Sequence, residues 1–281
     1  MSLDHPNKPQ QMYIELLKKS LSGFQNLEMG LRVSYLLHCM DTSTAYDLDH
    51  VINISKYEQD VINRLLEDPD GRDNYRERVF GFPATMIGKA RLDNLEFCIK
   101  TVLADNVPGD FMETGVWRGG ATIFMRGMLE AMNNEDKKVW VADSFRGLPE
   151  PILEQDGGLD FYLDPILSVS RDIVEENFRR YDLLDDRVNF IEGWFEDSMP
   201  LAPVEKLSIL RLDGDLYKST MDVLDSMYEK VTDGGFVIID DYGAIDACRQ
   251  AVHDFRSTHG INDKITDIDW TGSYWRKGEG K

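Results

Sequence analysis

Short apolar runs alternate with segments of helical apolar spacing from about residue 85 to the end of the chain. The predicted strands are 110–113, 139–142, 188–191, 207–212, 235–239, 265–269 and 273–276. The predicted helices between them are 90–104, 121–132, one that begins at Ser170, 219–230 and 246–258. This alternation predicts an α/β fold with a seven-stranded, mainly parallel sheet that carries helices on both faces.

The first 84 residues have a different pattern, which is helical and irregular. The apolar residues that recur there at helical spacing are Tyr13, Leu16, Leu17 and Leu21. A second helical pattern covers 51–66, and turn signals follow at 68–71 (Asp-Pro-Asp-Gly) and 81–83 (Gly-Phe-Pro). We therefore expect an accessory or cap segment over 1–84 and a main domain over 85–281.

The charge balance limits the partners of the protein. The chain has 31 Lys and Arg against 51 Asp and Glu, which gives a formal net charge of −20. Such a surface argues against binding nucleic acid, and against docking on an anionic membrane. Neither a signal peptide nor a membrane span is evident in the sequence, and Cys39, Cys98 and Cys248 are widely spaced. These features predict free thiols in a cytoplasmic protein.

The turn after the first strand carries an acid followed by glycines, in the order Glu113-Thr-Gly-Val-Trp-Arg-Gly-Gly120. It lacks the G-x-G-x-x-G pattern of dinucleotide-binding enzymes, and a carboxylate at Glu113 would repel a pyrophosphate at the helix N-terminus. This counts against a nicotinamide-dependent oxidoreductase. A carboxylate here suits a ligand with an ammonium or sulfonium cation, although a plain strand–helix turn is equally compatible with the pattern.

The next two strands also end in residues that suit a nucleoside. Asp143 follows the second strand, where an acid commonly accepts hydrogen bonds from the hydroxyls of a ribose. The alternative is an acid that only caps a turn or helix. Trp194 and Phe195 follow the third strand, where aromatic rings can pack on adenine or can simply fill a half-buried gap.

Four aspartates end two further strands: Asp213 and Asp215 follow 207–212, and Asp240 and Asp241 follow 235–239. Carboxylates at the tips of adjacent parallel strands repel one another strongly without a cation. An all-oxygen set indicates a hard divalent cation, with Mg²⁺ favoured over Mn²⁺ or Ca²⁺. The alternative is that each acid caps the following helix, but Ser219 and Asp246 look like better caps.

An acidic run over 150–164 follows the second strand. Its simplest interpretation is a surface loop. Because long loops at the carboxyl edge of a sheet are often functional, the run is also compatible with a substrate lid.

Together these motifs resemble class I S-adenosylmethionine (SAM) methyltransferases. More closely, they are similar to the macrocin O-methyltransferase family, which methylates sugar hydroxyls on antibiotic-type natural products. The resemblance runs from about Thr85 to Arg276. The segments that carry it are METGVWRGG, VADSFRGLP, VEENFRRYDLLDDRV, GWFEDS, LRLDGDLYKST, GGFVIIDDY and IDWTGSYWRK.

The resemblance implies a role for each matching position. Those implied to contact SAM are Thr85, Met86, Glu113, Thr114, Gly115, Val116, Trp117, Asp143, Ser144, Phe145, Ser170, Gly193, Trp194, Phe195 and Asp213. The implied Mg²⁺ ligands are Asp213, Asp240 and Asp241, with Asp213 also as the catalytic base and Asp215 as the less favoured candidate. Catechol-type enzymes place a lysine where this chain has Leu216, so a sugar alcohol is the favoured acceptor.

The expected function is therefore Mg²⁺-dependent transfer of the SAM methyl group to a sugar hydroxyl on a glycosylated natural product, such as a macrolide. The alternatives are a catechol-type O-methyltransferase and a SAM-binding protein without catalysis. The expected partners are a small glycosylated acceptor and further copies of the chain in a dimer or larger homo-oligomer, with neither nucleic acid nor membrane.

Overall fold

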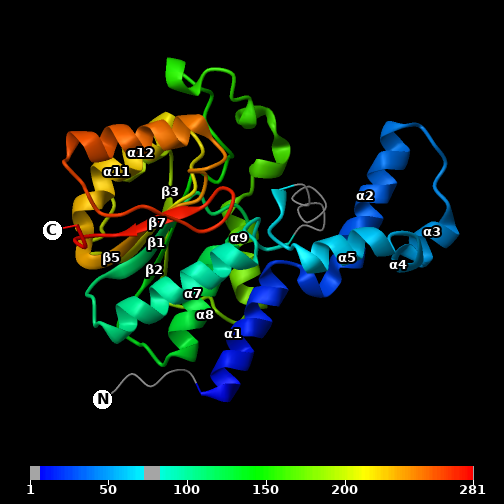
Figure 1. Ribbon diagram of the computed structural model, residues 1–281, viewed down its shortest axis with the longest axis horizontal. Helices are drawn as coiled ribbons and strands as arrows, with labels where there is room; N and C mark the ends of the chain where they lie inside the picture. Colours follow the sequence, from blue (N-terminus) through cyan, green and yellow to red (C-terminus); the bar gives the residue numbers. More distant parts are fainter. Residues whose placement is uncertain (1–6, 73–82, 281) are drawn as a thin grey trace.

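A seven-stranded sheet with the order β3-β2-β1-β4-β5-β7-β6 forms the centre of the protein. The computed structural model describes residues 7–72 and 83–280 (Figure 1). The strands are β1 (Asp110–Thr114), β2 (Val139–Asp143), β3 (Val188–Glu192), β4 (Leu207–Leu212), β5 (Val231–Ile239), β6 (Thr266–Asp267) and β7 (Ser273–Arg276). Strands β1 to β5 are parallel, whereas β7 runs antiparallel to both β5 and β6. The predicted α/β fold is confirmed.

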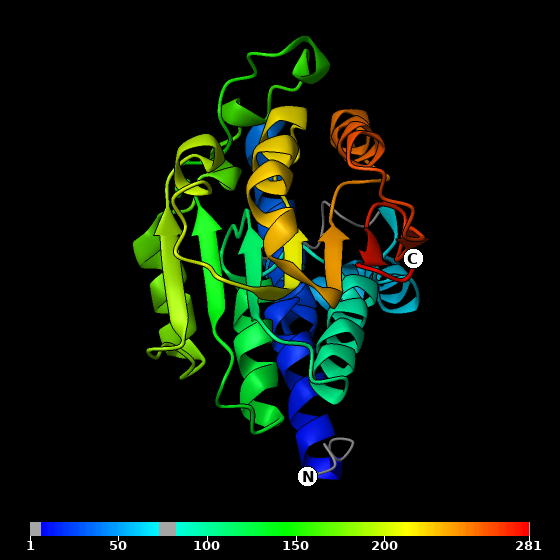
Figure 2. The ribbon, with the colours of Figure 1, turned by 90° about the vertical axis from the view of Figure 1, so that its left-hand side faces the viewer.

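Helices cover both faces of this sheet (Figure 2). The α-helices after residue 83 are α7 (Lys89–Ala104), α8 (Gly120–Ala131), α9 (Arg171–Arg180), α10 (Phe195–Ser198), α11 (Tyr217–Met227) and α12 (Asp246–Thr258). The short 3-10 helices are η1 (Phe24–Asn26), η3 (Glu154–Asp156), η4 (Phe161–Leu163), η5 (Pro165–Leu167) and η6 (Tyr228–Lys230). One hydrophobic core joins the sheet to α7, α8 and α9, and a second joins its other face to α11 and α12.

The boundaries predicted from the sequence agree with the observed boundaries of most of these elements within a few residues. Strand β5 begins at Val231 rather than at residue 235, and β6 covers two residues of the predicted 265–269. Helix α9 begins directly after Ser170, as predicted, while α11 begins two residues before Ser219. In the described ranges, 7–72 and 83–280, no helix combines the length and apolar character needed to cross a bilayer.

Helix α1 (Lys8–Leu21) packs against α8, one of the helices that cover the sheet (Figure 1). Its buried face differs from the predicted one, because Ile14, Leu17 and Leu21 are buried whereas Tyr13 and Leu16 are 38% and 56% exposed. Gly127 of α8 permits this packing, since a Cβ atom there would lie 2.5 Å from Leu17 Cδ2. The absence of a side chain at this one position lets the two helices approach closely.

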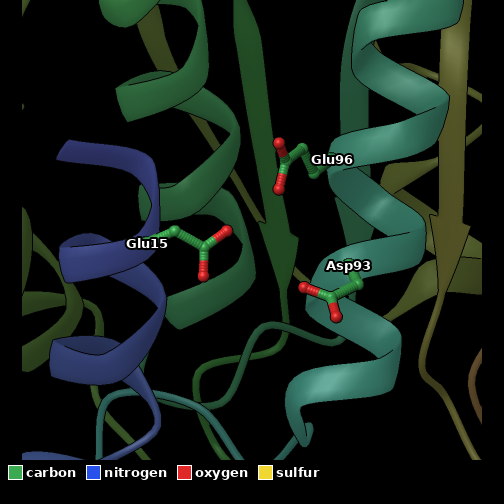
Figure 3. A group of neighbouring side chains, drawn as sticks. All are labelled: Glu15, Asp93 and Glu96. Atoms are coloured by element: carbon green, nitrogen blue, oxygen red, sulfur yellow. The ribbon is translucent and has the colours of Figure 1, made fainter. Parts of the chain in front are cut away.

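A group of acids also joins α1 to α7. Glu15 of α1 and the α7 residues Asp93 and Glu96 point toward one another (Figure 3), and their carboxylate oxygens lie within 4.8 Å. The ammonium group of the buried Lys18 donates to both Asp93 and Glu96. A lysine thus already supplies the positive charge at this group, which acts as an ion-pair network that fixes α1 on α7.

The other N-terminal helices extend away from the sheet (Figure 1). They are α2 (Leu27–Asp41), α3 (Leu48–Ile52), α4 (Ile54–Tyr57) and α5 (Gln59–Glu67). The predicted helix over 51–66 is therefore three short helices, and α2 had no separate prediction. The turn at 68–71 is confirmed by a hydrogen bond from Gly71 N to Asp68 O at 3.2 Å. Gly81 and Phe82 of the second predicted turn lie outside the described residues.

Candidate active site

A cavity of about 1410 Å³ opens at the carboxyl ends of the parallel strands. Ligands of open α/β sheets bind at this edge. Pockets for a single small molecule usually measure about 300–1,000 Å³, so this cavity has room for more than one ligand. Of the described residues before position 83, only Arg72 contributes to its wall. A cap over the site made by 1–84 therefore stays a prediction.

Most of the residues predicted to contact a cofactor meet in this cavity. Those that line it are Thr85, Met86, Glu113, Gly115, Val116, Trp117, Asp143, Ser144, Gly193, Trp194, Phe195 and Asp213. Three others do not: Thr114 is fully buried, Phe145 packs on Phe190, and Ser170 is exposed at the start of α9. The structure gives no support to a contact between these three side chains and a ligand in the cavity.

The glycine turn after β1 lies directly against the loop that follows β4. Gly115 has a φ of +83°, and a Cβ atom on it would lie 1.8 Å from the carbonyl oxygen of Asp213. Only glycine fits both the conformation and the space. The turn therefore brings the predicted cofactor loop and the predicted metal loop together.

Asp143 organises the same turn from the end of β2. Its two carboxylate oxygens accept hydrogen bonds from the backbone N–H groups of Val116 and Phe145, both at 2.7 Å. Burial raises the pKa of Asp143, whereas these hydrogen bonds lower it in part. The turn-acid interpretation of Asp143 is thus confirmed, while its contact with a ribose stays a prediction. Both can hold, because a carboxylate has about four lone-pair sites.

The aspartates at the ends of β4 and β5 converge. Leu212 pairs with Ile239 in the sheet, so Asp213 and Asp240 follow at neighbouring positions. Carboxylate oxygens of Asp213, Asp240 and Asp241 lie within 4.8 Å of one another. Opposite ligands of one Mg²⁺ ion are about 4.2 Å apart, because each Mg–O bond is about 2.1 Å. The group needs little adjustment to hold such an ion.

Two buried arginines, which sequence reasoning missed, hold these acids. Arg211 of β4 is 2% exposed and donates to Glu113, to Asp240 and, at 2.8 Å, to Asp213. Arg91 of α7 contacts Asp240 and, at 3.1 Å, Asp269. A signal was present in the sequence: Arg211 is the one charged residue within the apolar run 207–212, and a charge in a buried strand must find a partner.

The arginines correct the argument that the acids repel one another without a metal. Two guanidinium groups, those of Arg91 and Arg211, contact four carboxylates, those of Glu113, Asp213, Asp240 and Asp269. Within the described part of the chain, Asp215 and Asp241 form no ion pair. Asp241 Oδ2 and Glu113 Oε2 are buried without a hydrogen-bond partner. Negative charge therefore remains in excess, and an oxygen-only donor set suits a hard cation.

Burial raises the pKa of these acids, and neighbouring carboxylates add to the effect. The pKa of Asp213 rises to about 6 through burial and then Asp240, despite the opposing effect of Arg211. The pKa of Asp215 rises to about 8 through burial, Asp213 and Asp240. Burial also raises the pKa of Glu113 to about 8, although Arg211 opposes this. Such crowding favours uptake of either a proton or a cation.

The sequence of this chain matches the model of the family described as macrocin O-methyltransferase (TylF) over residues 10–277. The chain belongs to the macrocin O-methyltransferase family. It is accordingly an O-methyltransferase, and the interpretations as an oxidoreductase or a non-catalytic binding protein lose their support.

Relatives of this member of the macrocin O-methyltransferase family are named as O-methyltransferases of natural products. Mycinamicin III 3''-O-methyltransferase of Micromonospora griseorubida is 53% identical over 282 residues, covering 97% of this chain and 98% of that protein. A 4'-O-methyltransferase from Streptomyces olivaceus, named for a dimethoxy-rhamnosyl tetracenomycin C, is 53% identical over 197 residues, covering 68% and 75%. The solved O-methyltransferase NovP superposes with a TM-score of 0.75 at 39% identity, covering 95% and 99%.

The predicted helix caps are wrong in this O-methyltransferase. Ser219 lies inside α11, and Asp246 is the first residue of α12, after an N-cap at Ile245. The N-terminus of α11 is instead capped by Asp156, which accepts from Tyr217 N at 2.5 Å and from Lys218 N at 3.2 Å. A residue of the acidic run thus acts on the loop that carries Asp213 and Asp215.

Proposed function

We propose that this O-methyltransferase transfers the methyl group of SAM to a hydroxyl of a sugar on a glycosylated natural product, with Mg²⁺ held by Asp213, Asp240 and Asp241. One observation carries the proposal: the oxygen-only acid group lies in the wall of a cavity large enough for a cofactor and an acceptor. The names of the relatives support a glycosylated acceptor.

The residues at one end of the cavity fit SAM. The buried, unpartnered Glu113 Oε2 suits the ammonium group of its methionine part, and the backbone at Gly115 leaves space for close approach. Asp143 has lone pairs left for a ribose, and Trp194 and Phe195 offer aromatic surface to adenine. When bound, SAM supplies an electrophilic methyl group on a sulfonium cation.

The aspartates at the other side of the Gly115 turn act on the acceptor. A divalent cation, when bound, supplies positive charge that makes an alcohol easier to deprotonate. Asp213, Asp240 and Asp241 hold it, and Arg91 and Arg211 keep Asp240 and Asp213 in place. Positioning of the hydroxyl against the methyl group then supplies much of the rate.

The proton of the hydroxyl needs an acceptor, for which Asp213 and Asp215 are the candidates. Asp213 already accepts a hydrogen bond from Arg211 and belongs to the group of metal ligands, so a guanidinium group and a bound cation would both favour its charged form and make it a weaker base. Asp215 lines the same cavity and has no ion pair among the residues described. We therefore propose Asp215 as the base and Asp213 as a metal ligand, which reverses the preference that the resemblance implies.

An acceptor screen tests the proposed substrate class. The purified enzyme with SAM and Mg²⁺ is expected to methylate a glycosylated macrolide or another glycosylated natural product and to release S-adenosylhomocysteine. A simple catechol serves as the comparison, because Leu216 stands where catechol-type enzymes have lysine. Product mass and NMR identify the methylated oxygen. Methylation of the catechol with all glycosides left unchanged would contradict the proposal.

We also propose a homo-oligomer and a cytoplasmic location. Helices α2 to α5 expose several large apolar side chains, which would be covered by another copy of the chain. They are Met29, Met40, Leu48, Ile52, Tyr57 and Leu66. The cytoplasmic location is supported by three buried cysteines that are all free thiols.

A further inference from the structure

Asp156 differs in burial from the rest of the long connection between β2 and α9. In the segment 148–168, all of which is described, it is the only buried residue, at 1% exposed. Its neighbours Glu154, Gln155, Gly157 and Gly158 are exposed. Charged residues are rarely buried unless their charge is satisfied. The burial of a single carboxylate in a surface segment therefore indicates a specific attachment.

The attachment is the N-terminus of α11. The N-cap position of this helix is Leu216, whose side chain cannot accept a hydrogen bond. Asp156 supplies both acceptors from a distant part of the chain, one oxygen to Tyr217 N and the other to Lys218 N. Its negative charge is also favourable at the positive end of the helix dipole. The segment 148–168 is thus pinned to α11 through one side chain.

The same contact lies next to the proposed catalytic base. Asp215 is two residues before Tyr217 and has a φ of +57°, a conformation uncommon outside glycine. Leu216 N donates to Gly214 O at 2.5 Å, so the loop is a tight turn that leads directly into α11. A carboxylate that fixes the first N–H groups of α11 therefore also limits where Asp215 can lie.

The segment 148–168 has a second attachment, on the cofactor side of the cavity. Trp117 Nε1 donates to Ile166 O at 2.7 Å. Between the two attachments the segment lies beyond the carboxyl ends of the strands (Figure 2). Its apolar side chains, among them Pro149, Ile152 and Phe161, form part of the cavity wall. Ile152 is also 73% exposed, so an apolar acceptor in the cavity would cover it.

We propose that 148–168 is the lid over the acceptor and that Asp156 is its latch, a positioning residue that closes the lid and holds Asp215 in its working place. The proposal rests on the proposed function. When this contact breaks, water forms hydrogen bonds with the Asp156 carboxylate and with the two backbone N–H groups of α11. Because water replaces the lost hydrogen bonds, the contact can break and form again. An acceptor can then enter the cavity. When the lid closes again, its apolar side chains cover the acceptor and Asp156 again fixes the turn at Asp215.

The test compares Asp156→Ala with Asp156→Asn and with Glu154→Ala, which removes an exposed acid from the same short helix. With a glycoside found in the screen, Asp156→Ala should lower kcat/KM for that acceptor about tenfold to a hundredfold, because small misplacements of reacting groups cost that much. The affinity for SAM, measured by calorimetry, should stay within about twofold, since both hydrogen bonds of Asp156 go to the N-terminus of α11 and neither goes to the glycine turn after β1. Asp156→Asn keeps one acceptor oxygen and should regain part of the loss, whereas Glu154→Ala should behave as wild type.

Limited proteolysis measures how firmly Asp156 holds the segment 148–168, and it needs no acceptor. Chymotrypsin should cut Asp156→Ala at Phe161 or Tyr162 faster than it cuts the wild type and Glu154→Ala, while circular dichroism shows the same fold. Equal cutting of all three, or an unchanged kcat/KM in Asp156→Ala, would overturn the proposal. If Asp156→Ala does not fold, Asp156→Asn carries both measurements. A wild type that methylates no glycoside refutes the proposed function, and the cutting rates then still decide on the latch.

Discussion

Asp215→Asn is expected to lower kcat about a thousandfold while Mg²⁺ and SAM still bind. A general base contributes about 10²–10⁴ in rate, and an amide cannot accept the proton that the hydroxyl loses. Asp215 lines the cavity, forms no ion pair within the described residues and is not one of the three converging aspartates, so its removal leaves the group of metal ligands intact. The measurements are kcat on the glycoside, and calorimetry with SAM and with Mg²⁺.

Two further variants make this result specific. Asp213→Asn should lose Mg²⁺ affinity together with turnover, because Asp213 belongs to the three converging aspartates. Asp222→Asn removes another cavity acid, one that pairs with Lys218, and should keep turnover near that of the wild type. If Asp215→Asn retains most of its activity while Asp213→Asn loses turnover with Mg²⁺ still bound, the base is Asp213 instead.

Arg211→Met is expected to lower the free energy of unfolding by about 3–5 kcal/mol, the cost of removing one partner from a buried ion pair. Glu113, Asp213 and Asp240 all lose a guanidinium partner in this variant, and two of them are almost fully buried. The total stability of a domain is about 5–15 kcal/mol, so the loss is a large fraction of it. Urea unfolding at neutral pH measures the change.

Arg211→Lys and Arg179→Met are the matched controls. Lysine keeps the charge without the planar fork that reaches several carboxylates at once, so Arg211→Lys should fall between the wild type and Arg211→Met. Arg179 is exposed on α9 and, among the described residues, pairs only with acids of the same helix, so Arg179→Met should change stability by less than about 0.5 kcal/mol. An Arg211→Met variant as stable as Arg179→Met would show that the buried network does not stabilise the fold.

The residues that meet at the carboxyl edge of the sheet could be predicted from the sequence, because two simple rules determine their positions. Apolar runs locate the strands, and parallel strands of one sheet end at a common edge, so Asp143, Asp213 and Asp240 had to meet. Trp194 and Phe195 reach the same cavity for the same reason. The distance between these residues in the sequence does not matter, since each is placed by the strand directly before it.

The partners of these acids were not predictable in the same way. Arg211 faces Glu113 because β1 and β4 are neighbours in a particular register, which the apolar pattern of a single strand does not contain. Asp156 caps α11 from 61 positions earlier, whereas sequence rules for helix caps examine only adjacent residues. Helices α3 to α5 are short, so a weak periodic pattern over 51–66 did not separate them.

The metal dependence of turnover tests the central claim most directly. Enzyme treated with EDTA and then freed of chelator is assayed with SAM and the glycoside acceptor while Mg²⁺ is added back. The claim predicts that activity is lost with the metal, returns as Mg²⁺ is titrated in, and does not return in an Asp241→Asn variant, which lacks one of the three converging aspartates. Full activity of the metal-free enzyme would contradict it.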